Sequence, residues 1–163
     1  MTKKDKFITF FKNKSFYQIY NNGGDLDDLC DLLSEDEIDK LIELNVQFIR
    51  SCSPSSTIIL QDLIVNGQLT IINFDSGLKR LLHPKEFIAI LFHEIGHVFN
   101  PGFTGIEAEY AADRFAGAKG YAKWIVSGLE KGVKNKWMGF EEASCRLRID
   151  KLKEKFASLP NEN

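Results

Sequence analysis

The segment that most constrains the fold of this chain is residues 84–99, PKEFIAILFHEIGHVF. It opens with Pro84, which suits the first turn of a helix, and Asn100-Pro101-Gly102 follows as a stop signal. A helix that is apolar over most of its surface has to be buried against other elements. We therefore predict a buried helix from about residue 84 to residue 99, with the rest of the domain packed around it.

The flanking segments predict an α+β domain that is mostly helical, with one β-hairpin at about 57–74 beside this helix. The runs TIILQDLIV and QLTIINF are rich in β-branched residues and are joined by Asn66-Gly67, which favours a two-residue turn. Ser34 and Glu37 form a capping box that predicts a helix continuing to about Ser51. Further helices are predicted at residues 5–20, shortly before residue 33, and at 106–119, 121–131 and 140–159, the last with Leu147, Leu152 and Phe156 as core candidates.

Two residues of the apolar helix, His93 and His97, are candidate metal ligands. Residues four apart lie on one helical face, so both imidazoles can reach a single ion. Zinc suits these ligands, although cobalt or manganese could bind the same set. Glu94 is rotated about 100° from His93, so it can take a proton from metal-bound water without being a ligand. The histidines could instead be satisfied by backbone carbonyls in the core.

A carboxylate is expected to complete the site. His83 is too far away, because the ten residues between it and the first motif histidine span about 15 Å along a helix. In EAEYAADRFA, residues 107–116, Glu109 and Asp113 lie four apart on one helical face. Glu109 can be the third ligand, and Asp113 can accept the free N–H of a liganding imidazole and fix its tautomer. Glu107 is the alternative ligand, because predicted helix boundaries slip by a few residues.

The pattern HEIGH followed by EYAADRFA, an ExxxD arrangement, resembles the gluzincin zinc metallopeptidases, particularly the soluble catalytic core of the HtpX-like branch and the compact minigluzincins. The resemblance covers about residues 84–118. It implies that His93, His97 and Glu109 bind one zinc ion per chain, that Glu94 is the general base and that Asp113 supports a ligand histidine. We expect a single zincin-like domain over 1–163, with an N-terminal helical region at 1–52, the hairpin and zinc-site core at 57–118, and C-terminal helices at 120–163.

The resemblance implies a metallopeptidase, an endopeptidase by expectation, whose substrate is a peptide or an unfolded or regulatory protein. The strand at 68–74 could bind an extended substrate along an exposed edge. The ImmA/IrrE-like regulatory peptidases are a second resemblance, through HExxH followed by ExxANxFA, with Asp113 at their Asn position. A latent peptidase blocked by its own basic C-terminal helix is another alternative. A non-catalytic zinc-stabilised interaction module is disfavoured by Glu94, because structural zinc needs ligands but no base.

Composition narrows the classes of protein to which this chain can belong. With 44% hydrophobic residues and a formal net charge of −2, the 163-residue chain suits one domain with a core, and no strongly basic patch indicates nucleic-acid binding. No signal peptide or stretch of about 20 apolar residues is present, so we expect a cytoplasmic protein without membrane contact. The three cysteines, Cys30, Cys52 and Cys145, are widely spaced and are expected to be reduced thiols.

Overall fold

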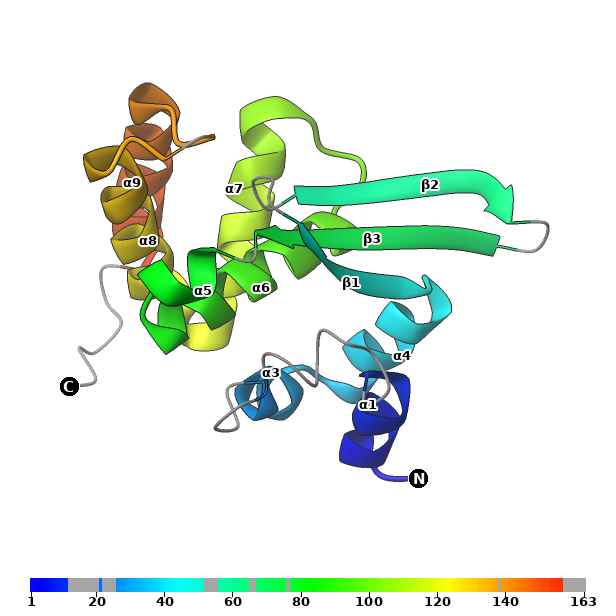
Figure 1. Cartoon of the computed structure of the whole chain (residues 1–163). Coiled ribbons are helices and arrows are strands. Elements are labelled where there is room, and N and C mark those ends of the chain that lie inside the picture. The colour runs from blue at the N-terminus through cyan, green and yellow to red at the C-terminus, as the bar shows by residue number, and fades with distance from the viewer. Residues whose placement is uncertain are drawn as a thin grey trace. The chain divides into compact units, whose positions relative to one another are not determined.

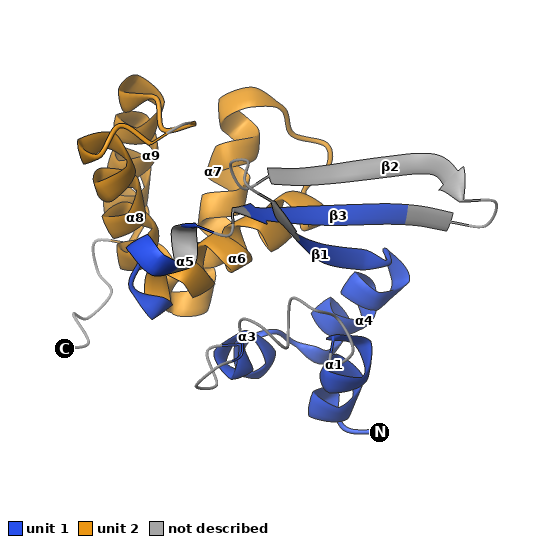
Figure 2. Cartoon of the chain, in the orientation of Figure 1, with its two compact units in different colours: residues 1–84 blue, residues 85–163 orange. Residues whose placement is uncertain are grey.

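The computed structural model describes residues 1–11, 21, 26–51, 56–64, 67–75, 77–137 and 139–156 (Figure 1). The chain divides into two compact units, Met1–Pro84 and Lys85–Asn163, which Figure 2 distinguishes by colour. The fold is α+β and mostly helical, as predicted. That the chain forms one domain, with the hairpin beside the 84–99 helix, stays a prediction.

The first unit combines short helices with a three-stranded sheet. Its elements are α1 (Lys3–Phe11), α3 (Asp27–Leu32), α4 (Glu35–Glu43), β1 (Val46–Ser51), β2 (Ser56–Ile64), β3 (Gly67–Asp75) and α5 (Leu78–Leu81). The predicted capping box begins α4, because the Ser34 hydroxyl accepts from the Glu37 N–H and the Glu37 carboxylate accepts from the Ser34 N–H. Residues 12–20, the second half of the predicted first helix, lie outside the described residues.

The prediction that the capped helix continues to Ser51 is wrong. α4 ends at Glu43, and β1 follows from Val46 to Ser51. Asn45 has φ of 47°, a left-handed conformation that Asn tolerates and that ends the helix. Val46 and Phe48 are both buried, which is the two-residue alternation of a strand, whereas the helical spacing of Ile42, Val46 and Ile49 favours a longer helix.

The predicted hairpin is present, since β2 and β3 pair antiparallel, although Asn66 of the turn lies outside the described residues. The sheet is larger than predicted, because β1 adds to the other side of β3 in parallel, giving the order β1-β3-β2. β3 is therefore the central strand, with Thr70, Ile72 and Phe74 buried. The prediction that this strand offers an exposed edge to a substrate is wrong, because both of its edges are paired.

Helices make up the second unit. They are α6 (Pro84–Phe99), which begins at the unit boundary, α7 (Gly105–Ala116), a π-helical turn η1 (Gly117–Tyr121), α8 (Ala122–Lys134) and α9 (Glu142–Phe156). The predicted bounds of α6 are confirmed. Within α9, Leu152 is buried as predicted but Leu147 is exposed, because the buried stripe runs through Cys145, Ile149 and Leu152 and Leu147 lies off it. Residues 157–159 of this predicted helix lie outside the described part of the chain.

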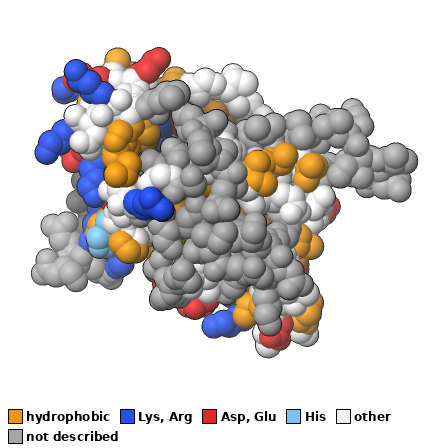
Figure 3. Space-filling model, viewed as in Figure 1, with side chains coloured by type: hydrophobic (Ala, Val, Ile, Leu, Met, Phe, Trp, Pro, Cys, Tyr) orange, Lys and Arg blue, Asp and Glu red, His pale blue; other side chains and the backbone are white. Residues whose placement is uncertain are grey.

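Three further properties bear on the expectations from composition: surface charge, membrane-spanning segments and the cysteines. Figure 3 shows lysine and arginine side chains at several separate places on the visible face, among acidic, polar and apolar side chains. Within the described ranges, no helix combines the length and the apolar character needed to cross a bilayer. Cys30 and Cys145 are free and buried, and Cys52 lies outside the described residues.

Candidate metal centre

The motif helix α6 is buried along nearly its whole length, which fixes both histidines in place. His93 is 7% exposed, and its neighbours Phe92 and Ile95 are fully buried. At the C-terminal end the Asn100 side chain donates a hydrogen bond of 2.8 Å to the Gly96 carbonyl, satisfying one of the carbonyls that a helix end leaves without a partner. The loop to α7 then reverses the chain, and Gly105 begins α7 with φ of 56°.

Gly96 lets α7 approach α6 at the level of the motif. A Cβ at this position would lie 2.7 Å from the Ala112 Cα atom and 2.9 Å from the Ala112 carbonyl oxygen, distances that no real side chain tolerates. Ala112, a small and fully buried residue, faces this contact from α7. Phe115 extends it by packing against the rings of Phe92 and Phe99. The close crossing brings the carboxylates of α7 to the histidines of α6.

His93, His97 and Glu109 converge at this crossing, with their ligand atoms within 4.8 Å of one another. The two Nε2 atoms of the histidines are 3.1 Å apart. The Glu109 carboxylate lies 3.4 Å from each of these nitrogens, through Oε2 to His93 and Oε1 to His97. Atoms that bind one tetrahedral zinc ion at about 2.0–2.1 Å are separated by about 3.3–3.4 Å. The donor set and its spacing therefore fit a metal ion.

Asp113 lies behind this cluster and determines which ring nitrogen of His93 faces it. Its Oδ1 atom is 2.8 Å from His93 Nδ1, and the Asp113 side chain is 2% exposed. A carboxylate accepts a hydrogen bond, so Nδ1 carries a proton and Nε2 is directed at His97 and Glu109. Metal-ligating histidines commonly make this contact, which orients the ring and raises its basicity.

Arg148 of α9 joins the cluster from a part of the chain without a predicted role. Its guanidinium donates to both oxygens of Asp113, from Nε at 2.8 Å and from Nη2 at 2.7 Å. Its third nitrogen, Nη1, lies 2.8 Å from Glu109 Oε2. A carboxylate has about four lone-pair positions, so Glu109 can accept this contact and still bind a metal through another lone pair. Arg148 thus holds both α7 carboxylates in their positions.

The charges in this cluster shift one another's protonation. Burial disfavours the charged form of His93, but the Asp113 charge and the hydrogen bonds to Asp113 and Glu109 outweigh burial and raise the pKa of His93 to about 9. Burial would raise the pKa of Asp113, yet Arg148 and His93 hold it below its usual value. The pKa of Glu109 is also lowered, because hydrogen bonds to both histidines outweigh its burial. Both carboxylates are therefore ionised at neutral pH, and a metal ion competes with a proton for His93 Nε2.

The remaining predicted residues take different positions. Glu94 is 4% exposed and follows His93 on α6, but it is not one of the three converging ligands. Glu107, the alternative ligand, is not one of them either; its side chain is exposed and lines a pocket beside α7. The structure thus brings the three predicted ligands together in a group that could hold a metal ion, while zinc binding and the catalytic role of Glu94 stay predictions.

Two important residues were not predicted from the sequence. Gly96 was part of the motif but its contact with Ala112 requires knowing how α6 and α7 cross. Arg148 carried a signal that can be recognised afterwards: it is one residue before Ile149 and four before Leu152, at the edge of the apolar stripe of α9. If such a side chain turns inward, its charge needs an anionic partner, because charged side chains are almost never buried unpaired.

Comparison of the sequence with protein-family models and curated proteins, and of the structure with solved structures, gave no significant match.

Proposed function

We propose that this chain is a zinc metallopeptidase that hydrolyses peptide bonds, with Glu94 as general base. The observation that carries the proposal is the convergence of His93, His97 and Glu109 at the spacing of zinc ligands. Three protein ligands of this kind are the pattern of catalytic zinc sites, which keep a fourth position for water or substrate. The resemblance of HEIGH and EYAADRFA to gluzincin motifs supports the same assignment.

When bound, zinc would polarise the substrate carbonyl and lower the pKa of a coordinated water molecule to about 7. Glu94 accepts a proton from the attacking water and later delivers it to the leaving amine. The C–N bond breaks as the hydroxyl group of the water adds to the carbonyl carbon and its proton goes to the nitrogen. The products are a carboxylic acid and an amine. Asp113 keeps His93 in the tautomer that presents Nε2 to the metal. Arg148 holds the carboxylates of Asp113 and Glu109 in position beside the histidines.

The burial of this charged network is consistent with metal binding, and the number of its ligands favours a catalytic over a structural zinc site. Buried carboxylates and cations are individually unfavourable in a protein core and are retained where they are paired or bind metals. A structural zinc site needs four ligands and no base, whereas within the described part of the chain this cluster has three ligands, and Glu94 follows the first of them on α6. The regulatory peptidase alternative shares this chemistry and differs in its substrate.

The experiment that tests the proposal is mass-spectrometric detection of cleavage products from a denatured peptide library. Zinc-loaded wild-type protein is compared with zinc-loaded Glu94→Gln, which keeps the size of the side chain and removes the base. Loss of a general base lowers rates by about 100-fold or more, so cleavage is expected from the wild type and not from Glu94→Gln. Glu130→Gln, an exposed position on α8, is the matched control and should cleave normally.

Equal cleavage by wild type and Glu94→Gln would contradict the proposed role of Glu94. Absence of cleavage by either, with one zinc per chain in both, would contradict peptidase activity and favour the zinc-stabilised interaction module.

A further inference from the structure

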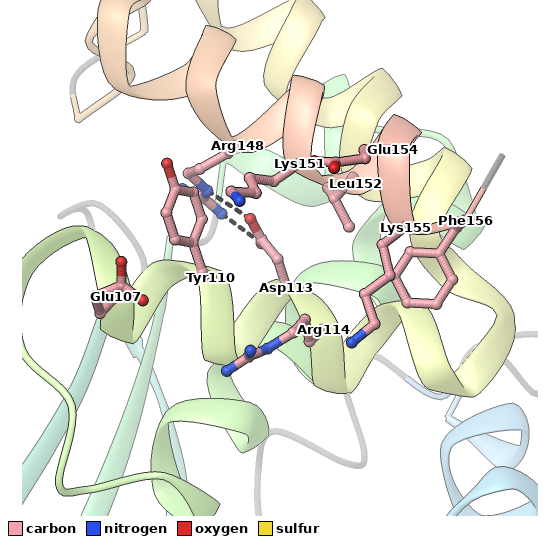
Figure 4. Close-up of a pocket in the computed structure, with 10 residues that line it drawn as sticks. All are labelled: Glu107, Tyr110, Asp113, Arg114, Arg148, Lys151, Leu152, Glu154, Lys155 and Phe156. Carbon is pink, nitrogen blue, oxygen red and sulfur yellow. Dashed lines mark hydrogen bonds and ion pairs between the residues drawn. The ribbon is translucent and has the colours of Figure 1, made fainter.

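A pocket of about 450 Å³ lies between α7 and α9, next to the candidate metal centre (Figure 4). α7 contributes Tyr110, Asp113 and Arg114 to its lining, and α9 contributes Arg148 and Lys151, among others. This volume is within the range of pockets that bind small molecules or single side chains, about 300–1,000 Å³. The cleavage mechanism proposed above makes no use of the pocket itself.

Two residues belong to both the pocket and the metal cluster. Asp113 lines the pocket and contacts His93, and Arg148 lines the pocket and contacts Glu109. The pocket and the metal cluster therefore share the Asp113–Arg148 ion pair. This shared pair is the structural link between the pocket and a peptide held at the metal centre.

The charges that line the pocket favour an anion. The lining holds three carboxylates and four cations, which leaves an excess of one positive charge; the cations are Arg114, Arg148, Lys151 and Lys155. In Figure 4 Glu107 lies at one end of the labelled group, whereas Glu154 lies beside Lys151 on α9. The same view shows the Lys151 ammonium group pointing toward the Asp113–Arg148 pair.

Apolar groups complete the lining. The Lys151 Nζ atom lies 6.0 Å from the centre of the Tyr110 ring, and Leu152, which also lines the pocket, is 3% exposed. Phe156 closes the far end. Lys151 is exposed, so its charged end remains at the surface, while the apolar groups can contact the stem of a bound side chain. The lining complements a carboxylate that is joined to an apolar stem or neighbour.

We propose that this pocket binds an acidic side chain of the peptide substrate, with Lys151 as the principal contact. The inference rests on the proposed function, because it assigns a preference for acidic peptides to that same metal site. Lys151 acts in substrate selection only, so its loss should change which peptides bind without changing the zinc site.

The test measures binding to zinc-loaded Glu94→Gln protein, so that cleavage does not interfere. Fluorescein-labelled octapeptides of alanine and phenylalanine carry one Glu at each successive position, and matched peptides carry Gln. Fluorescence anisotropy should show about tenfold tighter binding of the best Glu peptide than of its Gln partner, the effect of one charge-assisted contact. Adding Lys151→Gln should abolish most of this difference.

Lys153→Gln is the matched control, because Lys153 is also an exposed lysine of α9 but pairs with Glu130 and does not line the pocket. It should keep the full preference. A preference that survives Lys151→Gln would overturn the inference, and so would the absence of any preference. Free glutarate that competes as strongly as the Glu peptide would show a simple anion site and overturn the peptide assignment.

The proposed peptidase activity and the proposed acidic-peptide pocket can be contradicted independently of each other. Glutamate-dependent cleavage that requires Glu94 but ignores Lys151 would overturn the pocket assignment and leave the peptidase intact. Binding that depends on Lys151, without any Glu94-dependent cleavage, would overturn the proposed function and support the pocket as an acidic-peptide site.

Discussion

Two clusters in residues 85–163 are built in the same way and differ in what they bring together. In the first, Glu86 of α6 is 1% exposed and accepts hydrogen bonds from Ser127 and Lys131 of α8, at 2.5 and 2.6 Å. In the second, Asp113 of α7 is 2% exposed and accepts from Arg148 of α9 at 2.7 and 2.8 Å. Each cluster joins a buried carboxylate to a cation from a helix further along the chain.

The Glu86 cluster has no imidazole in these contacts and joins α6 to α8. Asp113, by contrast, also contacts His93 and thereby directs a ring nitrogen toward His97 and Glu109. Among the described residues, this is the one group of three His, Cys, Asp or Glu side chains whose ligand atoms converge closely enough for a metal ion. A buried ion pair alone therefore indicates helix packing, and convergence of ligand atoms indicates a site.

Removal of Arg148 from the Asp113 cluster should lower the stability of the protein more than the other substitutions proposed below. Arg148→Ala would leave the Asp113 charge buried with only His93 as its partner, and breaking a buried pair costs about 3–5 kcal/mol. We expect the free energy of unfolding of the metal-free protein to fall by about 3 kcal/mol, measured by urea denaturation. Arg148→Lys should recover part of this, because lysine keeps the charge but not the fork that reaches both carboxylates.

Arg146→Ala is the control for that experiment. Arg146 also lies on α9 and pairs with Glu142, but its side chain is 72% exposed. Exposed pairs of this kind contribute about 0.3–0.5 kcal/mol. Equal destabilisation by Arg146→Ala and Arg148→Ala would contradict the central role given to Arg148.

The affinity for zinc should depend on pH through His93. The pKa of His93 is raised from 6.5 to about 9, so the ring is protonated at pH 7 and zinc has to displace that proton. Affinity should rise about tenfold per pH unit between pH 7 and pH 9, measured by competition with a chelator calibrated at each pH. The same shift stabilises the metal-free fold fully below pH 6.5, and this contribution is lost as pH rises through about 9. A flat profile would contradict the pairing of His93 with Asp113.

The crossing of α6 and α7 is tested by Gly96→Ala. The added methyl group would meet the Ala112 backbone at 2.7 Å and force the helices apart, and overpacking of this kind costs about 1–3 kcal/mol. Zinc affinity should fall at least tenfold, because displacement of α7 moves Glu109 away from the histidines. Gly128→Ala on α8 is the matched control, since nothing lies within 4 Å of its added methyl group.

The smallest loss of stability is expected from a substitution in the Glu86 cluster. Glu86→Gln removes the charge but keeps an oxygen that accepts from Ser127, and Lys131 is 39% exposed and can turn to water. We expect a loss of about 1 kcal/mol of stability with no change in zinc affinity. Weakened zinc binding in this variant would remove the distinction between the two clusters.

Local patterns predicted the parts of the site that depend on one helix at a time. The bounds of α6 follow from Pro84 and from the stop signal after Phe99, and the histidine pair and the Glu109–Asp113 pair each follow from four-residue spacing. The same reasoning failed at β1, because its identity depends on parallel pairing with β3, about twenty residues away, and helical spacing competed with the strand pattern.

Contacts between distant segments could not be predicted in this way. Arg148 is 35 residues from Asp113 along the chain, and no local period connects them. The role of Gly96 likewise depends on the angle at which α7 crosses α6, which the loop of residues 100–104 does not encode in a recognisable pattern. The sequence therefore indicated which residues could bind a metal, and packing identified the residues that hold them in place.

The most direct test of the candidate metal centre is the zinc content of the purified protein, measured by native mass spectrometry together with competition against a chelator. The wild type and Glu94→Gln should each bind one zinc ion per chain with the same affinity, because Glu94 is not a ligand. His97→Ala should lose at least about 100-fold in affinity, more than the loss of an outer contact. If His97→Ala bound zinc as tightly as the wild type, or if Glu94→Gln lost it, the assignment of the metal ligands would be contradicted.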